Sequence, residues 1–191
     1  MTTRLDQLVA ALPPPITGGP EDADRAQAAV ALILGPDPDR LLLIRRAERA
    51  GDPWSGHLAL PGGRREPEDA DLLDTAIRET REEVGLTLER DNCRATLDDL
   101  LPRIQVLPHI LVRPFVFVLP QTLDPGLSAE VVAAEWVALA WLLRDGVLET
   151  RTLAMRGGPQ AVQGYALPGG FLWGMTERIV TPVLERWRTL G

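Results

Sequence analysis

The chain has 191 residues, of which 45% are hydrophobic and 25% charged, which is typical of one soluble globular domain with a buried core. Its formal net charge of −7 excludes a surface that attracts nucleic acid or anionic membrane as a whole. A single cysteine, Cys93, excludes an internal disulfide and fits a reducing compartment.

The first 24 residues are expected to form a short helix and a flexible lead-in, followed by one domain over residues 25–191. Leu5, Leu8, Val9 and Leu12 recur at helical spacing, and prolines 13–15 end the helix. The acidic Asp6 and the absence of a basic leader argue against a signal peptide. Because no other apolar stretch is long and uninterrupted enough to cross a bilayer, we expect a cytoplasmic protein without a membrane partner.

Two strands are predicted at residues 26–34 and 40–46, joined as a hairpin by a Gly-Pro-Asp-Pro-Asp turn. A polar loop follows and leads into a short strand at residues 57–60. Trp54 in this loop either packs on the core or forms a wall of a substrate pocket.

Beyond residue 90 the chain again alternates strands and helices. Residues 93–104 and 111–119 are predicted strands, and Pro102, Pro108 and Pro114 would confine them to sheet edges or bulges. The remaining predicted elements are a strand at 130–139, a helical turn at 140–144, a hairpin of 147–155 with 161–167, and a helix at 173–190 kinked by Pro182. Strands on both sides of a central helix predict an α/β fold with a mixed sheet between helical layers.

The most informative stretch is residues 60–86, which begins with a Pro-Gly-Gly turn and a charged loop and then becomes helical. The apolar side of the predicted helix is formed by Leu73, Ala76, Ile77, Thr80 and Val84. Gly85 ends the helix, as a C-terminal glycine often does.

Three carboxylates project from one side of this helix, because Glu79, Glu82 and Glu83 stand at i, i+3 and i+4. They repel one another unless a cation neutralises them, and oxygen ligands of this kind suit Mg²⁺ or Mn²⁺. Arg78 is placed to reach back to a carboxylate of the preceding loop. The alternative is a solvated, glutamate-rich helical surface. Such a surface would not need glycines, acids and an arginine in this particular order.

This segment resembles the box of the Nudix hydrolases, which reads G, five residues, E, seven residues, R-E-U-x-E-E-x-G-U with U aliphatic. The matching residues are Gly63, Arg78, Glu79, Glu82, Glu83, Gly85 and Leu86. Thr80 departs from the pattern at U, and the loop is one residue longer, so that Asp69 replaces the first glutamate. Glu68 and Asp71 remain alternative partners for Arg78.

The resemblance implies an α/β/α sandwich and Mg²⁺- or Mn²⁺-dependent hydrolysis of a diphosphate bond. Glu79, Glu82 and Glu83, with the backbone at Gly63, would hold the metal, and the bare Gly62 and Gly63 would let the phosphates approach. Arg78 would be a catalytic residue together with Glu79 and Glu82. The general base would be Glu79 or Glu82, with Glu130 as a third candidate. The Lys-dependent phosphate loop is excluded because the chain has no lysine.

Residues 41–63 are similar to the signature of the coenzyme A pyrophosphatase branch, with a double arginine, a glycine four residues before Leu60, and Leu-Pro-Gly-Gly. The extended box and residues 173–176 also look like that branch, whereas Ile44 and the inserted residues 52–54 depart from it. This resemblance implies cleavage of coenzyme A or its thioesters to 3′,5′-ADP and 4′-phosphopantetheine. Arginines for the 3′-phosphate would come from Arg45, Arg46, Arg49, Arg64 and Arg65, unless these are ordinary surface arginines.

Other functions stay open at this point. ADP-ribose, dinucleotides and nucleoside or deoxynucleoside triphosphates are alternative substrates. A non-catalytic Nudix-like sensor or binding domain is a second class, although such domains often lose box glutamates and all three are present here. The expected partner is a small nucleotide, and a homodimer is compatible with the resemblance.

Overall fold

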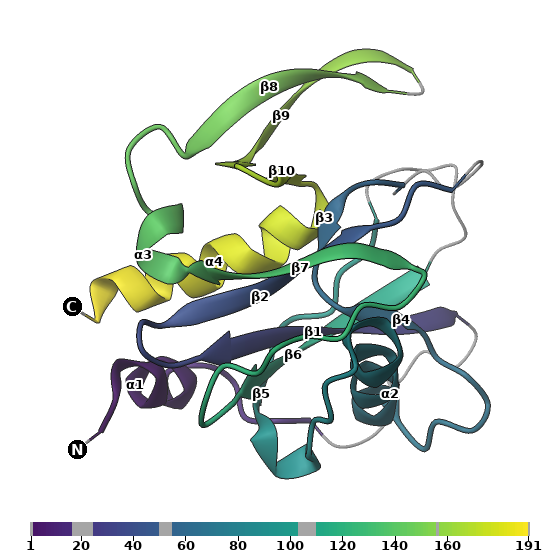
Figure 1. The fold of residues 1–191 in the computed structure, drawn as a ribbon, viewed down its shortest axis with the longest axis vertical. Helices are drawn as coiled ribbons and strands as arrows, with labels where there is room; N and C mark the ends of the chain where they lie inside the picture. The colour runs from purple at the N-terminus through teal and green to yellow at the C-terminus, as the bar shows by residue number, and fades with distance from the viewer. Residues whose placement is uncertain (1, 17–24, 50–54, 103–109, 156, 191) are drawn as a thin grey trace.

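The computed structural model describes residues 2–16, 25–49, 55–102, 110–155 and 157–190. Several sequence predictions therefore lie outside the described residues: the lead-in at 17–24, the inserted residues 52–54 with Trp54, and Pro108. The described part of the chain forms two β-sheets and four α-helices (Figure 1).

A seven-stranded mixed sheet forms the centre of the molecule, with the order β3-β2-β1-β6-β5, while β4 pairs with β1 and β7 pairs with β2. Its strands are β1 (Ala26–Gly35), β2 (Arg40–Arg46), β3 (Leu58–Ala59), β4 (Gly62–Arg64), β5 (Cys93–Thr96), β6 (Ile110–Val118) and β7 (Val131–Ala138). The pair of β1 with β6 is parallel and the other pairs are antiparallel. The predicted hairpin of β1 with β2 and the mixed sheet are confirmed.

Helices cover both faces of this sheet, which confirms the predicted sandwich (Figure 1). Side chains of β1 alternate between the faces: Ala29, Ala31 and Ile33 pack toward α2 (Leu72–Val84), whereas Leu32 and Leu34 pack toward α4 (Met175–Thr189). The short helices α1 (Arg4–Ala10) and α3 (Leu139–Leu142) join the α4 side, and a 3₁₀ turn spans Arg90–Asn92.

Two arginines join helix α1 to α4: Arg186 of α4 donates to the carbonyl of Ala11 at the end of α1, and Arg4 of α1 contacts Trp187. The guanidinium of Arg4 lies 3.5 Å from the ring centroid of Trp187 and donates to the Trp187 carbonyl at 2.9 Å. Leu5, Leu8 and Val9 are buried in the same core cluster as Trp187. The N-terminal helix is thus part of the packed core on this face.

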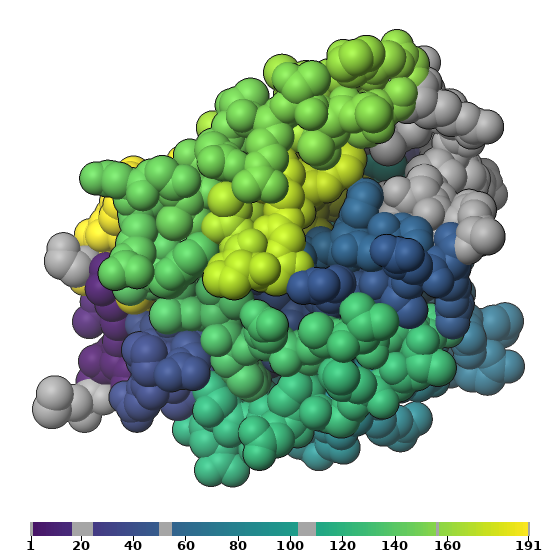
Figure 2. All heavy atoms as spheres, turned by 45° about the horizontal axis from the view of Figure 1, so that its top comes forward, coloured from purple at the N-terminus to yellow at the C-terminus, as the bar shows by residue number. Residues whose placement is uncertain are grey.

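A second, three-stranded antiparallel sheet consists of β8 (Leu148–Met155), β9 (Gly158–Leu167) and β10 (Gly170–Trp173). The β8–β9 hairpin agrees with the prediction, but β10 was not predicted. It forms because residues 167–170, which repeat the Leu-Pro-Gly-Gly sequence of residues 60–63, make a tight turn. This turn, with φ of 141° at Gly170, folds the chain back on β9. Figure 2 shows this turn, in yellow-green, lying against the blue atoms of β2 and β3.

For Pro114 the predicted edge strand is wrong, but the predicted bulge is present: Leu97 faces Pro114 and Leu100 faces Val112, so between these pairs two residues lie against one. Pro114 is in β6, which runs between β1 and β5. The pairing with β5 ends at Thr96, which lies opposite Phe115. No residue of β5 therefore needs the N–H that Pro114 lacks. Leu97 then uses the Pro114 carbonyl instead, to which it donates at 2.9 Å.

Candidate active site

Gly62 and Gly63, predicted as part of a turn, are the first two residues of strand β4. These two residues, called the Gly62–Gly63 turn or glycine turn below, lie between β1 and α2. A Cβ on Gly62, where φ is 151°, would stand 2.3 Å from the carbonyl oxygen of Ala29. A Cβ on Gly63 would stand 2.4 Å from the carboxyl carbon of Glu79. Position 62 therefore requires glycine, because its φ and the sheet backbone exclude a side chain, whereas a side chain at position 63 would displace the Glu79 carboxylate.

Helix α2 is placed by its caps and its buried face. Asp71 caps the N-terminus by accepting the Asp74 N–H at 2.9 Å, and Gly85 ends the helix with φ of 66°. Thr80, the departure from the aliphatic position of the box, is buried and donates its hydroxyl to the Ala76 carbonyl at 2.7 Å. The hydroxyl is satisfied within the helix, so threonine fits this buried position.

Glu83 is the most buried of the three box glutamates, with 5% of its side chain exposed. Its Oε2 accepts the Gly62 N–H at 2.9 Å, which joins the helix directly to the glycine turn. Burial raises the pKa of Glu83 to about 7, and the carboxylates of Glu79 and Glu130 add to this, while the Gly62 hydrogen bond and Arg46 oppose it.

Glu79 and Glu82 share the guanidinium of Arg78. Nη1 of Arg78 donates to Oε1 of Glu79 and to Oε2 of Glu82, both at 3.1 Å. Burial raises the pKa of Glu79 above its usual value despite Arg78, whereas Glu82 has 53% of its side chain exposed. The structure thus brings Glu79 and Glu83 to the glycine turn and leaves Glu82 at the solvent side of the same cluster.

Arg78 pairs with Asp69, in the replaced glutamate position of the box. Two parallel hydrogen bonds join them, Nε to Oδ1 at 2.9 Å and Nη2 to Oδ2 at 3.0 Å. Nη2 also donates to the Arg64 carbonyl at 2.9 Å, which attaches β4 to the helix. Of the two alternatives, Asp71 caps α2 and pairs with Arg90, and Glu68 is exposed.

The carboxylate of Asp69 is buried and fully engaged. Besides Arg78, it accepts the Glu66 N–H and the Thr75 hydroxyl, both at 2.9 Å. Burial alone would raise the pKa of Asp69, but the hydrogen bonds from Arg78, Glu66 and Thr75 outweigh burial and lower it. Thr75 and Glu66 were not identified from the sequence, because neither belongs to the box pattern.

The five candidate substrate arginines do not converge, and Arg49 pairs with Glu130. Arg46 approaches Glu83, with Nη1 3.8 Å from Oε1. Arg65 braces the box loop by donating to the Asp69 and Ala70 carbonyls and to the Gln27 side chain, while the Arg64 side chain is exposed. Arg45, next to Arg46 in an alternating strand, faces the other side of the sheet.

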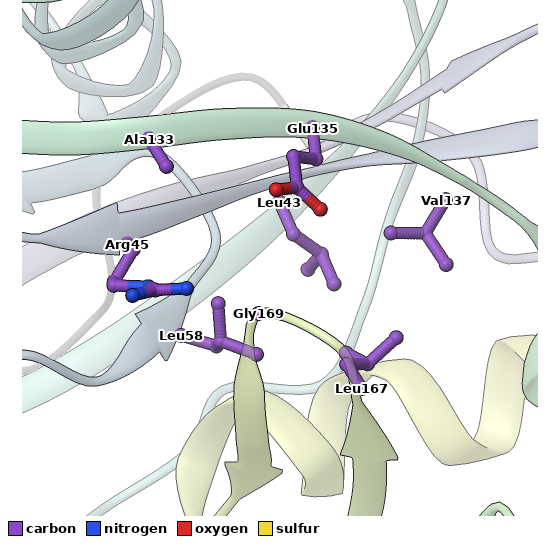
Figure 3. A pocket seen from close by; sticks show the side chains of 8 residues that line it. All are labelled: Leu43, Arg45, Leu58, Ala133, Glu135, Val137, Leu167 and Gly169. Carbon is purple, nitrogen blue, oxygen red and sulfur yellow. The ribbon is translucent and has the colours of Figure 1, made fainter.

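Arg45 lines a small hollow, partly open to solvent, on the α4 side of the sheet (Figure 3). The hollow lies between β2, β3, β7 and the turn from β9 to β10, and Glu135 is its other charged residue. Its apolar lining is Leu43, Leu58, Ala133, Val137 and Leu167. None of the box glutamates borders it.

Glu130 comes close to the box through a loop that is far away in sequence. Ser128 donates its N–H to the Glu83 carbonyl at 3.1 Å, and Gly126 to the Val84 carbonyl at 2.9 Å. The Glu130 carboxylate pairs with Arg49 at 3.0 Å. No spacing in the sequence could have indicated this approach, because it depends on the path of the loop after β6.

The described residues contain no ready-made group of three Asp, Glu, His or Cys side chains around a metal position. They do fit a hard divalent cation in another way. Glu79 and Glu83 are carboxylates with raised pKa values beside a turn whose glycines leave the backbone accessible. A cation there would offset the unfavourable burial of two neighbouring acids, and an all-oxygen donor set suits Mg²⁺ or Mn²⁺.

The NUDIX domain family model matches residues 24–156 of the chain. The chain belongs to the Nudix hydrolase family. "Uncharacterized Nudix hydrolase NudL" from Photorhabdus laumondii is 30% identical over 180 residues, covering 92% of this chain and 91% of the relative. An uncharacterized protein of Schizosaccharomyces pombe is 42% identical over 108 residues, which are 54% of this chain and only 33% of that protein.

Solved structures show the same fold. A MutT/nudix family protein from Enterococcus faecalis matches with a TM-score of 0.63 and 18% identity over 91% of this chain and 66% of that one. A bifunctional NMN adenylyltransferase/ADP ribose pyrophosphatase from Francisella tularensis, complexed with AMP and a Mn ion, matches with a TM-score of 0.58 and 17% identity. That match covers 90% of this chain and 43% of the other.

The protein is thus an enzyme of the pyrophosphohydrolase class. Nudix hydrolases generally use divalent metals. Among the described residues, no helix is long and apolar enough to span a membrane.

Asp69→Asn is expected to lower the free energy of unfolding by roughly 3–5 kcal/mol at pH 7, because it removes one partner of a buried ion pair. Since the folded-state pKa of Asp69 lies below the ordinary 3.8, the contribution is complete above about pH 4 and is lost as the pH falls through the folded-state value. Denaturant unfolding of both proteins between pH 7 and pH 3 measures this. A difference that did not shrink on acidification would contradict the assignment.

Gly63→Ala is expected to displace the Glu79 carboxylate, because the added Cβ would stand 2.4 Å from its carboxyl carbon. We expect a fall in kcat on the order of a hundredfold, since misplacement of about 1 Å can have that effect. Turnover of a diphosphate substrate with Mg²⁺ provides the measurement. Gly157→Ala is the matched control, because a Cβ there meets nothing within 4 Å; equal kcat in both variants would refute the prediction.

Proposed function

We propose that the protein is a Mg²⁺- or Mn²⁺-dependent pyrophosphohydrolase that cleaves coenzyme A or its thioesters to 3′,5′-ADP and 4′-phosphopantetheine. One observation carries the diphosphate chemistry: the side-chain-free Gly62–Gly63 turn contacts the buried carboxylate of Glu83 and the half-buried carboxylate of Glu79. The choice of coenzyme A rests on the likeness of residues 41–63 to that branch.

Glu79, Glu82 and Glu83 are the proposed metal-binding side chains, with the backbone at Gly63 beside them. A bound divalent cation would neutralise charge on the diphosphate and so stabilise the transition state of in-line attack by water. Arg78 has a separate task in this scheme. Through Asp69 and the Arg64 carbonyl it fixes the helix to β4, and through Glu79 and Glu82 it orients two of the acids.

The general base is proposed to be Glu79 or Glu82, with Glu130 as the third candidate. Glu79 is supported by its position beside the turn and by burial that raises its pKa, since a carboxylate with a raised pKa is the stronger base. Glu82 is supported by its exposure, which gives it access to water. Glu130 is supported by the closeness of its loop to the end of α2.

Arg46 and Arg64 are the better placed of the five proposed substrate arginines, since Arg49 is paired with Glu130. Arg46 lies at the carboxylates, and Arg64 follows the glycine turn with an exposed side chain. Arg65 is engaged in the box loop, and Arg45 would reach a substrate only if part of it extended to the other face of the sheet. A 3′-phosphate would be recognised by such guanidinium groups.

ADP-ribose, dinucleotides or nucleoside triphosphates form the second candidate class of substrate. It is supported by the departures from the coenzyme A signature at Ile44 and residues 52–54. A non-catalytic sensor role has less support, because Glu79, Glu82 and Glu83 are all present.

We further propose that residues 25–191 form the hydrolase domain, with residues 1–24 as an N-terminal extension whose helix packs on α4. A cytoplasmic location is supported by the single, buried Cys93. Homodimerisation stays a prediction from the family resemblance.

Glu83→Gln is expected to lower kcat on the order of 10²–10³-fold, a loss typical of removing one group that stabilises transition-state charge. Glutamine can still accept the Gly62 N–H, so the fold should be kept. Steady-state turnover with Mg²⁺ and thermal unfolding test both parts. Glu68→Gln, an exposed acid of the same loop–helix unit, is the control. Wild-type turnover in Glu83→Gln would overturn the assignment of Glu83 to the metal.

A substrate panel with purified protein and Mg²⁺ or Mn²⁺ tests the proposed specificity. We expect the highest kcat/KM for coenzyme A or acetyl-coenzyme A, with 3′,5′-ADP identified by mass. The same assay includes ADP-ribose, NADH and deoxynucleoside triphosphates. A higher kcat/KM for one of these would keep the hydrolase assignment and refute the coenzyme A proposal.

A further inference from the structure

Arg46 reaches Glu83 from the strand side of the site. It is the last residue of β2, and its Nη1 lies 3.8 Å from Oε1 of Glu83 on α2. The Arg46 side chain keeps 27% of its surface exposed, compared with 5% for Glu83. The pair therefore joins a nearly buried acid to a cation that lies at the border with solvent.

The two oxygens of Glu83 have different partners. Oε2 accepts the Gly62 N–H at 2.9 Å, which fixes the carboxylate relative to the glycine turn. Oε1 faces Arg46 at 3.8 Å, too far for a hydrogen bond but within ion-pair range. A ligand that approaches Oε1 would meet the guanidinium without breaking the hydrogen bond to the turn.

The backbone at Arg46 is held on both sides, so its position does not depend on this ion pair. Arg46 donates its N–H to the His57 carbonyl at 3.0 Å, and Ala47 donates to the Glu130 carbonyl at 2.8 Å. The pairing of β2 with β7 also shifts here: Arg45 lies opposite Ala133, but Arg46 lies opposite Val131. Such irregularities often re-aim a side chain near a functional site.

We propose that Arg46 is a positioning residue that pairs with Oε1 of Glu83. To bind at this oxygen, a divalent cation must first displace the Arg46 guanidinium. The inference rests on the proposed function, because it takes Glu83 as a metal-binding residue. A cation and a guanidinium repel each other and compete for one oxygen, so Arg46 weakens cation binding and keeps the buried acid compensated until the cation arrives.

The test is calorimetric titration of the purified full-length protein with Mn²⁺ alone, without substrate. Arg46→Gln removes the competing charge and is expected to bind Mn²⁺ about tenfold more tightly, as expected for two charges a few ångströms apart in a largely aqueous setting. Arg46→Lys keeps a cation at this position and should stay close to the wild-type Kd. Arg40→Gln is the matched control, because it makes the same change at the other end of β2.

Unchanged or weaker Mn²⁺ binding by Arg46→Gln would overturn the inference, as would equal tightening in Arg40→Gln. If Arg46→Gln did not fold, the Mn²⁺ Kd of Arg46→Lys would test the inference. A Kd of Arg46→Lys more than tenfold above the wild-type value would contradict it, because the proposed role needs only a positive charge at this position. Glu83→Gln in the same titration separates this inference from the proposed function. Wild-type Mn²⁺ affinity in Glu83→Gln would overturn both, whereas weakened binding there with no effect of Arg46→Gln would overturn this inference alone.

Discussion

The seating of the Gly62–Gly63 turn on the carboxylates of α2 is the contact on which the rest of the site depends. Glu83 holds the turn by accepting its N–H, and Glu79 fills the space where a Gly63 side chain would be. The sheet closes the other side, because Gly62 lies against the backbone of Ala29. Strand, turn and helix therefore have one relative position, and two acids are brought to a backbone that a phosphate or a metal can approach.

This arrangement places like charges together in a buried setting, which is unfavourable without a cation. The surrounding structure offsets the cost with interactions that lie one step away. The Asp69–Arg78 ion pair ties the box loop to α2, and Arg78 continues to the Arg64 carbonyl of β4. The apolar face of α2 packs on β1 and β6, which adds to the stability that this ion pair provides. The proposed metal-binding acids and the apolar packing thus lie on different sides of the same helix.

The sequence revealed most of what depends on local pattern. Helical spacing and Gly85 identified α2, two apolar runs joined by a turn identified the first hairpin, and the box pattern singled out the three glutamates. What it could not reveal depends on how distant segments meet. The choice of Asp69 over Asp71 follows from where α2 begins, since Asp71 is used as its cap. Pro114 lies in an inner strand, which is possible because its neighbour β5 stops one residue short of it. Arg45 and Arg46 were grouped as neighbours in sequence, although strand alternation sends them to opposite faces.

The central claim is that Glu79, Glu83 and the glycine turn together form the metal site. A crystal structure of the protein soaked in Mn²⁺, with anomalous diffraction measured at the manganese edge, tests it most directly. The account predicts an anomalous peak roughly 2.0–2.3 Å from carboxylate oxygens of both glutamates, beside the backbone of Gly62 and Gly63. A manganese peak elsewhere, with the Glu83 carboxylate still hydrogen-bonded to Gly62 and the Glu79 carboxylate still hydrogen-bonded to Arg78, would contradict this assignment.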